Sequence, residues 1–168
     1  MSERRIKMKV IFLDFDGVLN CARYRFSVAD YHSNFIDETR LKLLADFVNE
    51  TGAEIVLTTQ WRLHWNEGET QNHPDGDVIN ALFAKYGLKI YSKTDYLDNN
   101  RDLEVADWLV RHEVENYVIF DDVDCFWTES NRAHFVKTND AKDGLTGYEI
   151  GIARFVFNKN KEGCAWFT

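Results

Sequence analysis

The sequence predicts an α/β fold in which helices cover both faces of a mostly parallel β-sheet, a three-layer doubly wound arrangement. Short apolar runs rich in β-branched and aromatic residues alternate along the chain with longer segments of helical periodicity. The runs lack polar alternation, which is typical of strands buried on both faces. Because right-handed crossovers bring the carboxyl ends of parallel strands to one edge, polar residues that follow the strands are expected to meet there.

The first apolar run, residues 10–13, is followed directly by Asp14, Asp16 and Gly17. Side chains two residues apart on an extended segment point the same way, so both carboxylates are expected to face one pocket. The glycine permits a steep turn and a close approach of the backbone to a ligand. Two like charges repel, a divalent cation relieves that repulsion, and ligation by oxygen alone favours Mg²⁺. The pattern suits a reaction in which one aspartate attacks phosphorus and the other transfers protons.

The next segment is expected to form a small flap, because residues 17–35 are short, aromatic and mixed in polarity, too short for a large inserted domain. Asp37 is placed to cap a helix that runs to about residue 50, and Gly52 follows as its stop. The second strand is predicted at 54–57, where another apolar run occurs.

The middle of the chain repeats this alternation. His73–Gly76 is predicted to form a turn with proline at its second position. Asp77 is placed to cap a helix that ends before Gly87. A third strand is predicted at 88–91, and Asn100 is placed to cap the helix that follows it.

The last third contains a fourth strand at 117–120 and a short fifth strand at 134–137. Thr146 and Glu149 have the spacing of a capping box, which predicts a final helix through about Phe157.

Length and composition agree with one soluble domain that spans residues 1–168. The apolar share of 45% and the charged share of 29% are ordinary for a globular protein. No apolar run approaches a membrane span and no signal segment is visible, so no membrane partner and a cytoplasmic location are expected. The net charge of −8 argues against a large nucleic-acid surface. The three cysteines have no metal-binding or disulfide spacing.

Two further strands end in polar residues. The second strand is followed by Thr58 and Thr59, and a threonine hydroxyl there would hold a phosphoryl oxygen. Thr58 is preferred because it directly follows the apolar run. The fourth strand is followed by Asp121 and Asp122, an acid pair that packing alone does not explain.

These motifs resemble those of the haloacid dehalogenase superfamily, most of whose members are Mg²⁺-dependent phosphatases. Asp-Phe-Asp-Gly-Val-Leu at 14–19 resembles its first motif, Ile-Val-Leu-Thr at 55–58 its second, and Val-Ile-Phe-Asp-Asp at 118–122 its fourth. Leu-Thr-Thr-Gln-Trp-Arg at 57–62 and Arg-Asp-Leu-Glu-Val-Ala-Asp-Trp at 101–108 add a narrower similarity. They are similar to the small capless domains of this superfamily that are associated with Swiss Army Knife RNA-repair proteins.

The resemblance implies roles for the matching residues. Asp14 would be the nucleophile and Asp16 the acid and base. Mg²⁺ would be held by Asp14, by the backbone carbonyl of Asp16 and by Asp122, with Asp121 supporting the site. The cationic group would be Arg101, at the start of the helix before the fourth motif, or alternatively Lys93. The flap would contain a helical turn and a β-hairpin.

The expected partner is a phosphorylated substrate, either a small molecule or a nucleic-acid end. An open rim suits large substrates, and Arg62 and Arg23 are candidates for binding them, together with Thr58 and Thr59. Two other classes of protein fit the fold. A phospho-accepting receiver gathers similar residues but in a different strand order, and an interaction protein would keep the fold without turnover.

Overall fold

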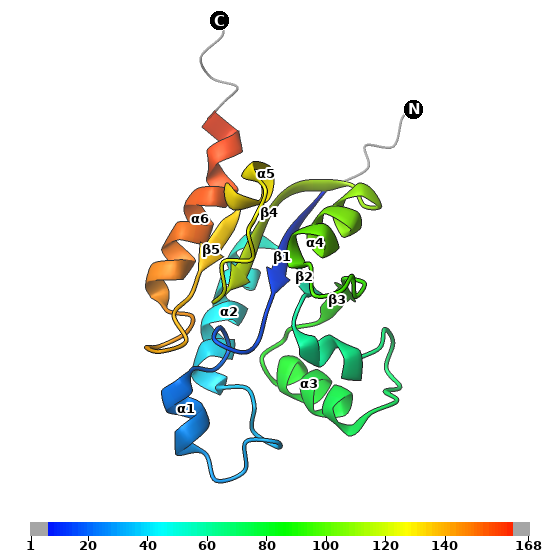
Figure 1. Cartoon of the computed structure of the whole chain (residues 1–168), viewed down its shortest axis with the longest axis vertical. Helices are drawn as coiled ribbons and strands as arrows, with labels where there is room; N and C mark the ends of the chain where they lie inside the picture. The colour runs from blue at the N-terminus through cyan, green and yellow to red at the C-terminus, as the bar shows by residue number, and fades with distance from the viewer. Residues whose placement is uncertain (1–6, 163–168) are drawn as a thin grey trace, which may run out of the picture.

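The computed structural model describes residues 7–162, which form a five-stranded parallel sheet with helices on both faces (Figure 1). The predicted α/β class with a parallel sheet is therefore confirmed. The strand order across the sheet is β3-β2-β1-β4-β5. The strands are β1 (Met8–Leu13), β2 (Glu54–Leu57), β3 (Ile90–Lys93), β4 (Val114–Asp121) and β5 (Phe135–Lys137).

The helices alternate with the strands, as the periodicity predicts. They are α1 (Ala22–Ser27), α2 (Glu38–Thr51), α3 (Pro74–Lys85), α4 (Arg101–Val110), α5 (Glu129–Arg132) and α6 (Gly147–Glu162), with a 3₁₀ helix η1 (Gln60–His64). Among residues 7–162, no helix combines the length and apolarity that crossing a membrane would require.

The central strand β1 separates two apolar cores because its side chains alternate between the two faces. Ile11 and Leu13 pack into the larger core with residues of α2, α3 and α6. Val10 and Phe12 pack into the smaller core, where the Trp108 ring of α4 meets the edge of the Phe12 ring at 5.4 Å between centroids. All four side chains are fully buried, which explains the unbroken apolar run in the sequence.

The strand order places a crevice between β1 and β4. The chain runs from β1 outward to β3 on one side, then returns to add β4 and β5 on the other side. In open α/β sheets, ligands bind at the carboxyl ends of strands where the order reverses in this way. The residues that follow β1 and β4 are therefore at the position where a site is expected.

Two predictions about the start of the third helix were wrong. The third helix begins at Pro74 rather than at Asp77, because the His73 side chain caps it by accepting from the Asp75 N–H at 3.1 Å. Proline suits the first helical turn, where its missing N–H has no partner to lose. The segment between His73 and Gly76 is therefore the start of α3 and not a separate turn.

The flap contains no β-hairpin, since residues 28–36 form only turns and bends after α1 (Figure 1). Side-chain and backbone hydrogen bonds, rather than a strand ladder, hold this segment. The Tyr24 hydroxyl donates to the Ile36 carbonyl at 3.0 Å, and the Asp37 N–H donates to the Leu19 carbonyl at 2.7 Å.

Candidate active site

Backbone hydrogen bonds hold the residues that follow neighbouring strands side by side at the carboxyl edge of the sheet. The Asp14 N–H donates to the Phe120 carbonyl at 3.1 Å, which ties the end of β1 to the end of β4. The Thr138 N–H donates to the Asp121 carbonyl at 3.0 Å and ties β5 to β4 in the same way. Backbone hydrogen bonds therefore continue one residue beyond the strands and position the side chains that follow.

Three of these side chains form an acidic cluster. Carboxylate oxygens of Asp14, Asp121 and Asp122 lie within 4.8 Å of one another. Burial raises the pKa of Asp14 to about 7, and Asp121 adds to the rise. Burial and Asp121 raise the pKa of Asp122 to about 6. Burial also raises the pKa of Asp121. Closely spaced, buried carboxylates are the arrangement that a hard divalent cation stabilises, so these residues fit such an ion.

Arg101 is the cationic group beside this cluster. One terminal nitrogen of its guanidinium lies 3.4 Å from Asp121 Oδ2 and 3.8 Å from Asp14 Oδ1. The same nitrogen is buried and has no hydrogen-bond partner among the described residues. A buried donor without a partner is costly, so a ligand oxygen that approaches Asp14 would satisfy it.

Lys93, the alternative cation, lies outside this group. Its ammonium donates to the backbone carbonyls of Arg62 at 3.0 Å and Trp65 at 2.5 Å. Burial, and secondarily Arg62, lowers the pKa of Lys93. Lys93 therefore holds the end of η1 in place, and Arg101 remains the candidate.

Asp16 is held by donors on both carboxylate oxygens. The Tyr31 hydroxyl and the Asn20 amide donate to Oδ1 at 2.6 and 2.9 Å, and the Trp61 indole donates to Oδ2 at 3.1 Å. The Trp61 ring is itself stacked on Phe35 at 3.9 Å between centroids. These contacts fix the Asp16 side chain, which does not belong to the acidic cluster of Asp14, Asp121 and Asp122.

Gly17 brings the first loop against the fourth-strand acids. Its φ of +78° lies in the left-handed region, and a Cβ there would sit 2.3 Å from Asp122 Cγ. The Thr138 hydroxyl donates to the Gly17 carbonyl at 2.7 Å. Only glycine allows this contact, so the sequence requirement at position 17 is a close approach as well as a turn.

These groups surround a small pocket of about 330 Å³. Its lining residues are Asp14, Asp16, Arg25, Gln60, Arg101, Asp122, Val123 and Asp140. Acids, an amide and two arginines around a pocket of this size fit a phosphate group together with a cation.

Thr58 and Thr59 lie at the carboxyl end of β2. The Thr58 N–H donates to the Leu13 carbonyl at 2.9 Å, which places Thr58 next to Asp14. Its hydroxyl is buried without a hydrogen-bond partner among the described residues, and neither threonine lines the pocket. The Thr59 hydroxyl accepts from the Trp61 N–H and caps η1. The structure therefore favours Thr58 over Thr59.

Arg62 was predicted to bind substrate, and the structure contradicts this because the side chain is only 1% exposed. Its guanidinium bonds to the carbonyls of Thr94 at 3.1 Å and Thr59 at 2.9 Å, and also to the carbonyl of Thr58. It pairs with the buried Glu104 carboxylate at 2.9 Å. Arg62 joins the ends of β2 and β3 to α4 and does not contact the pocket.

Arg23, the other predicted substrate-binding arginine, is exposed, pairs with Asp143 and does not line the pocket. Arg25, two residues later on α1, does line it. Its guanidinium contacts both Asp140 oxygens at 2.6 and 2.8 Å and the Asn20 amide oxygen at 2.8 Å. Because Asp140 lies far away in sequence, no local pattern indicates which arginine faces the site.

A second group that could hold a metal ion consists of His64, His73 and Asp75. The two imidazole rings are stacked at 4.0 Å, with 16° between their planes. The nitrogen lone pair of an imidazole lies in the plane of its ring. Because these two ring planes are nearly parallel, the rings would have to turn before a nitrogen of each could bind the same ion. Both Nδ1 atoms contact Asp75, and His73 also caps α3. These contacts explain why the three side chains lie together without a metal ion.

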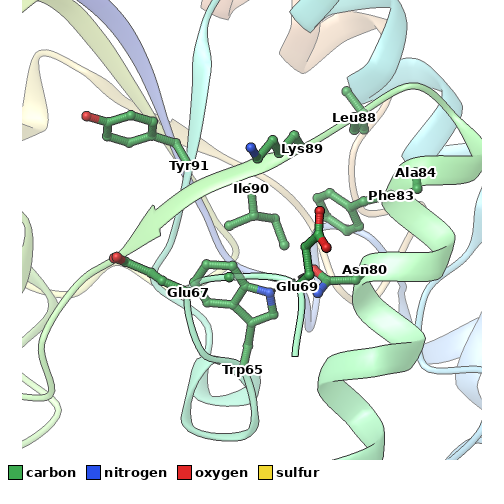
Figure 2. A pocket seen from close by; sticks show the side chains of 11 residues that line it. Trp65, Glu67, Glu69, Asn80, Phe83, Ala84, Leu88, Lys89, Ile90 and Tyr91 are labelled. Atoms are coloured by element: carbon green, nitrogen blue, oxygen red, sulfur yellow. Dashed lines mark hydrogen bonds between the residues drawn. The ribbon is translucent and has the colours of Figure 1, made fainter. Parts of the chain in front are cut away.

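A larger hollow of about 490 Å³ lies between α3 and β3. Figure 2 shows the Trp65, Phe83 and Ile90 side chains gathered there, with the Glu67 and Glu69 carboxylates nearby. None of the site aspartates lines this hollow, so it has no part in the chemistry considered below.

The sequence analysis did not predict that Asn20 and Tyr31 donate hydrogen bonds to the Asp16 carboxylate. Asn20 directly follows the first motif and is fully buried, and its position four residues after Asp16 was the one available signal. Tyr31 is an ordinary aromatic residue in an irregular segment, and only the fold brings its hydroxyl to Asp16.

Comparison with known protein families identifies a match over residues 10–150, to the HAD domain in Swiss Army Knife RNA repair proteins. Comparison with curated proteins and with solved structures gave no significant match. The matched range includes every site residue described above and most of the chain. This chain therefore belongs to the family of haloacid dehalogenase (HAD) domains of Swiss Army Knife RNA repair proteins.

Proposed function

We propose that this protein is a Mg²⁺-dependent phosphomonoester hydrolase that forms an aspartyl-phosphate on Asp14. The observation that carries the proposal is the cluster that Asp14 forms with the carboxylates of Asp121 and Asp122, with the Arg101 guanidinium beside it. Asp14 Oδ1 accepts from the Phe15 N–H at 2.9 Å, and no described residue hydrogen-bonds to Oδ2, which leaves that oxygen for attack.

The aspartates would hold the cation. Asp14 and Asp122 supply carboxylate ligands, the Asp16 backbone carbonyl is a further candidate, and Asp121 supports them from the buried side. A bound Mg²⁺ supplies positive charge that offsets carboxylate repulsion and neutralises phosphate oxygens.

The first step is attack of Asp14 Oδ2 on phosphorus, which forms an O–P bond as the bond to the leaving oxygen breaks. Asp16 donates its proton to that oxygen, so the product leaves as an alcohol. Arg101 and the Thr58 hydroxyl stabilise the negative charge on the phosphoryl oxygens.

The second step reverses the role of Asp16. Its carboxylate takes a proton from a water molecule that attacks phosphorus, and the bond to Asp14 breaks. Inorganic phosphate leaves, Asp14 is again a carboxylate, and Asp16 is again protonated. The donors from Tyr31, Asn20 and Trp61 keep the Asp16 side chain in one orientation through both steps.

The test is release of inorganic phosphate from a generic aryl phosphate with Mg²⁺. We expect turnover that EDTA abolishes and excess Mg²⁺ restores. Asp14→Asn keeps the size of the side chain but removes the nucleophile, so kcat should fall by at least about a thousandfold. Circular dichroism should show the same fold.

The matched control is Asp46→Asn, which makes the same chemical change at an exposed position paired only with Lys42 on α2. Its kcat should stay within about twofold of the wild-type value. Undiminished activity in Asp14→Asn would remove Asp14 from the nucleophile role. An aspartyl-phosphate that accumulates without turnover would favour a receiver-like module.

A further inference from the structure

A groove extends from the active-site pocket along the start of α4. It has a volume of about 560 Å³, and Val123 lines both it and the pocket. Its walls are two loops, residues 98–100 before α4 and residues 123–126 after β4. A substrate whose phosphate lies beside Asp14 and Arg101 can therefore place the rest of the molecule in this groove.

The groove presents apolar side chains to solvent. Phe126 is 94% exposed, and Val123 and Leu103 are each more than half exposed. Phe126 has a φ of +53°, a conformation that bulky residues rarely adopt. Strained residues of this kind gather at binding sites. An exposed ring beside a reaction centre provides a surface on which a planar group can stack.

The polar residues of the groove are acids and amides. Asp98 has no ion pair or hydrogen bond among the described contacts, and its left-handed φ of +52° lies at the turn before α4. Asp102 is buried and accepts from Thr128 and Asn131. No lysine or arginine lines the groove itself. An anionic group that entered it would meet negative charge.

Nearby cations are already committed to acids. Arg25 pairs with Asp140, and Arg101 lies between Asp14 and Asp121. Arg132 pairs at 3.0 Å with Asp124, which lines the groove. These pairs leave little positive charge for a second phosphate.

We propose that the physiological substrate is a mononucleotide-sized phosphomonoester with an uncharged leaving group, whose planar ring stacks on Phe126. This inference rests on the proposed phosphatase function. A nucleoside monophosphate meets the requirement, because its single phosphate lies in the pocket and its base is neutral. The phosphorylated end of an oligonucleotide is discriminated against, because its next phosphodiester approaches Asp98.

The test compares nucleoside 5′- and 3′-monophosphates with dinucleotides that carry a terminal phosphate at the same position. At low ionic strength, kcat/KM for the mononucleotide should exceed that for the matched dinucleotide by about tenfold or more. The ratio should shrink as salt is added, because exposed charges are screened. Dinucleotides cleaved as fast as mononucleotides would overturn the proposal.

Two variants test the charge and the ring separately. Asp98→Asn keeps a residue that tolerates the left-handed conformation and removes the charge. It should raise kcat/KM for the dinucleotide about threefold or more, with the mononucleotide changed less than about twofold. Asp46→Asn, the same change on α2, should alter neither substrate. Equal effects of the two variants would contradict a role for Asp98.

Phe126→Gly removes the ring and suits the positive φ, so it should not unfold the loop. KM for a nucleoside monophosphate should rise about fivefold or more, whereas KM for ribose 5-phosphate, which has no base, should stay unchanged. A parallel rise for both would overturn stacking on Phe126. Failure of wild-type protein on all phosphoesters, aryl phosphate included, would instead overturn the proposed function itself.

Discussion

Asp14 meets two opposing requirements. As the proposed nucleophile it must be ionised, yet burial, with help from Asp121, raises its pKa to about 7. Arg101 opposes this rise but lies 3.8 Å away, beyond hydrogen-bond distance. The protein alone therefore leaves Asp14 only partly ionised near neutral pH, and a bound cation would complete its ionisation.

The raised pKa predicts a pH-dependent stability in the absence of metal. Between the ordinary aspartate pKa of 3.8 and about 7, the folded state holds a proton on Asp14 that the unfolded state has lost. The contribution of Asp14 protonation to the free energy of unfolding is therefore complete at acidic pH and is lost as pH rises through about 7. Asp14→Asn escapes this loss, so in EDTA it should gain roughly 1–3 kcal/mol relative to wild type between about pH 4 and pH 7.

Urea unfolding at several pH values measures this difference, and Mg²⁺ should raise the Tm of wild type more near pH 7.5 than near pH 5. Asp46→Asn is the control, because its exposed carboxylate should give a difference from wild type that is nearly flat with pH. A flat difference for Asp14→Asn as well would mean that Asp14 is not buried among the other acids.

Between elements, one buried ion pair links three parts of the fold. Arg62 of η1 and Glu104 of α4 are both 1% exposed, and Arg62 also bonds to the carbonyl that follows β3. Glu104 Oε1 in turn accepts from the Leu97 N–H at 3.1 Å. The pair thus fixes the start of α4, where Arg101 projects toward the site.

Replacing Arg62 by lysine should destabilise the protein by about 2–4 kcal/mol, because a lysine cannot reproduce the planar set of donors and leaves Glu104 buried with fewer partners. Arg111→Lys is the matched control. Arg111 pairs with Asp107 and Asp95 in solvent, so its replacement should cost less than about 1 kcal/mol. Chemical unfolding compares the two. Equal costs would contradict the structural role given to Arg62.

The start of a helix could be predicted where a common capping residue stands beside it in the sequence. It could not be predicted where the structure depends on residues that lie further away or on an unusual cap. Asp37 and Asn100 cap α2 and α4 as expected, since an N-cap depends on residues two or three positions away. The start of α3 was missed because a histidine took the capping role. The hairpin expected in the flap is absent because Tyr24 and Tyr31 fix that segment through contacts that the sequence pattern does not contain.

At the scale of the molecule, the site forms where the loops after β1, β4 and β5 meet. Gly17 lies against Asp122 and its carbonyl accepts from the Thr138 hydroxyl, so it contacts the residues that follow β4 and β5. A side chain at this position must displace Asp122, one of the proposed cation ligands.

Gly17→Ala should therefore weaken Mg²⁺ binding by about tenfold or more, in addition to destabilising the fold by about 1 kcal/mol or more through its positive φ. Gly52→Ala is a close control, because Gly52 has a φ of +65° and nothing within 4 Å of an added Cβ. It should share the loss of stability without the loss of affinity. Calorimetric Mg²⁺ titration of both variants separates the effects. Equal affinities would show that Asp122 is not displaced or does not bind the ion.

The site residues that directly follow a predicted strand could be identified from the sequence. Asp14, Thr58, Asp121 and Asp122 each follow an apolar run, so the fold rule alone places them on one edge. The burial of Arg62 was not predictable, because it depends on carbonyls and an acid supplied by three other elements.

The order of strands has a consequence for how the chain is made. β1 ends at Leu13, but its neighbour β4 begins only at Val114, so during synthesis the backbone N–H and C=O groups on one edge of β1 stay unpaired until most of the chain has been translated. A nascent chain arrested before residue 114 would expose this edge and would be prone to capture by chaperones or to aggregation.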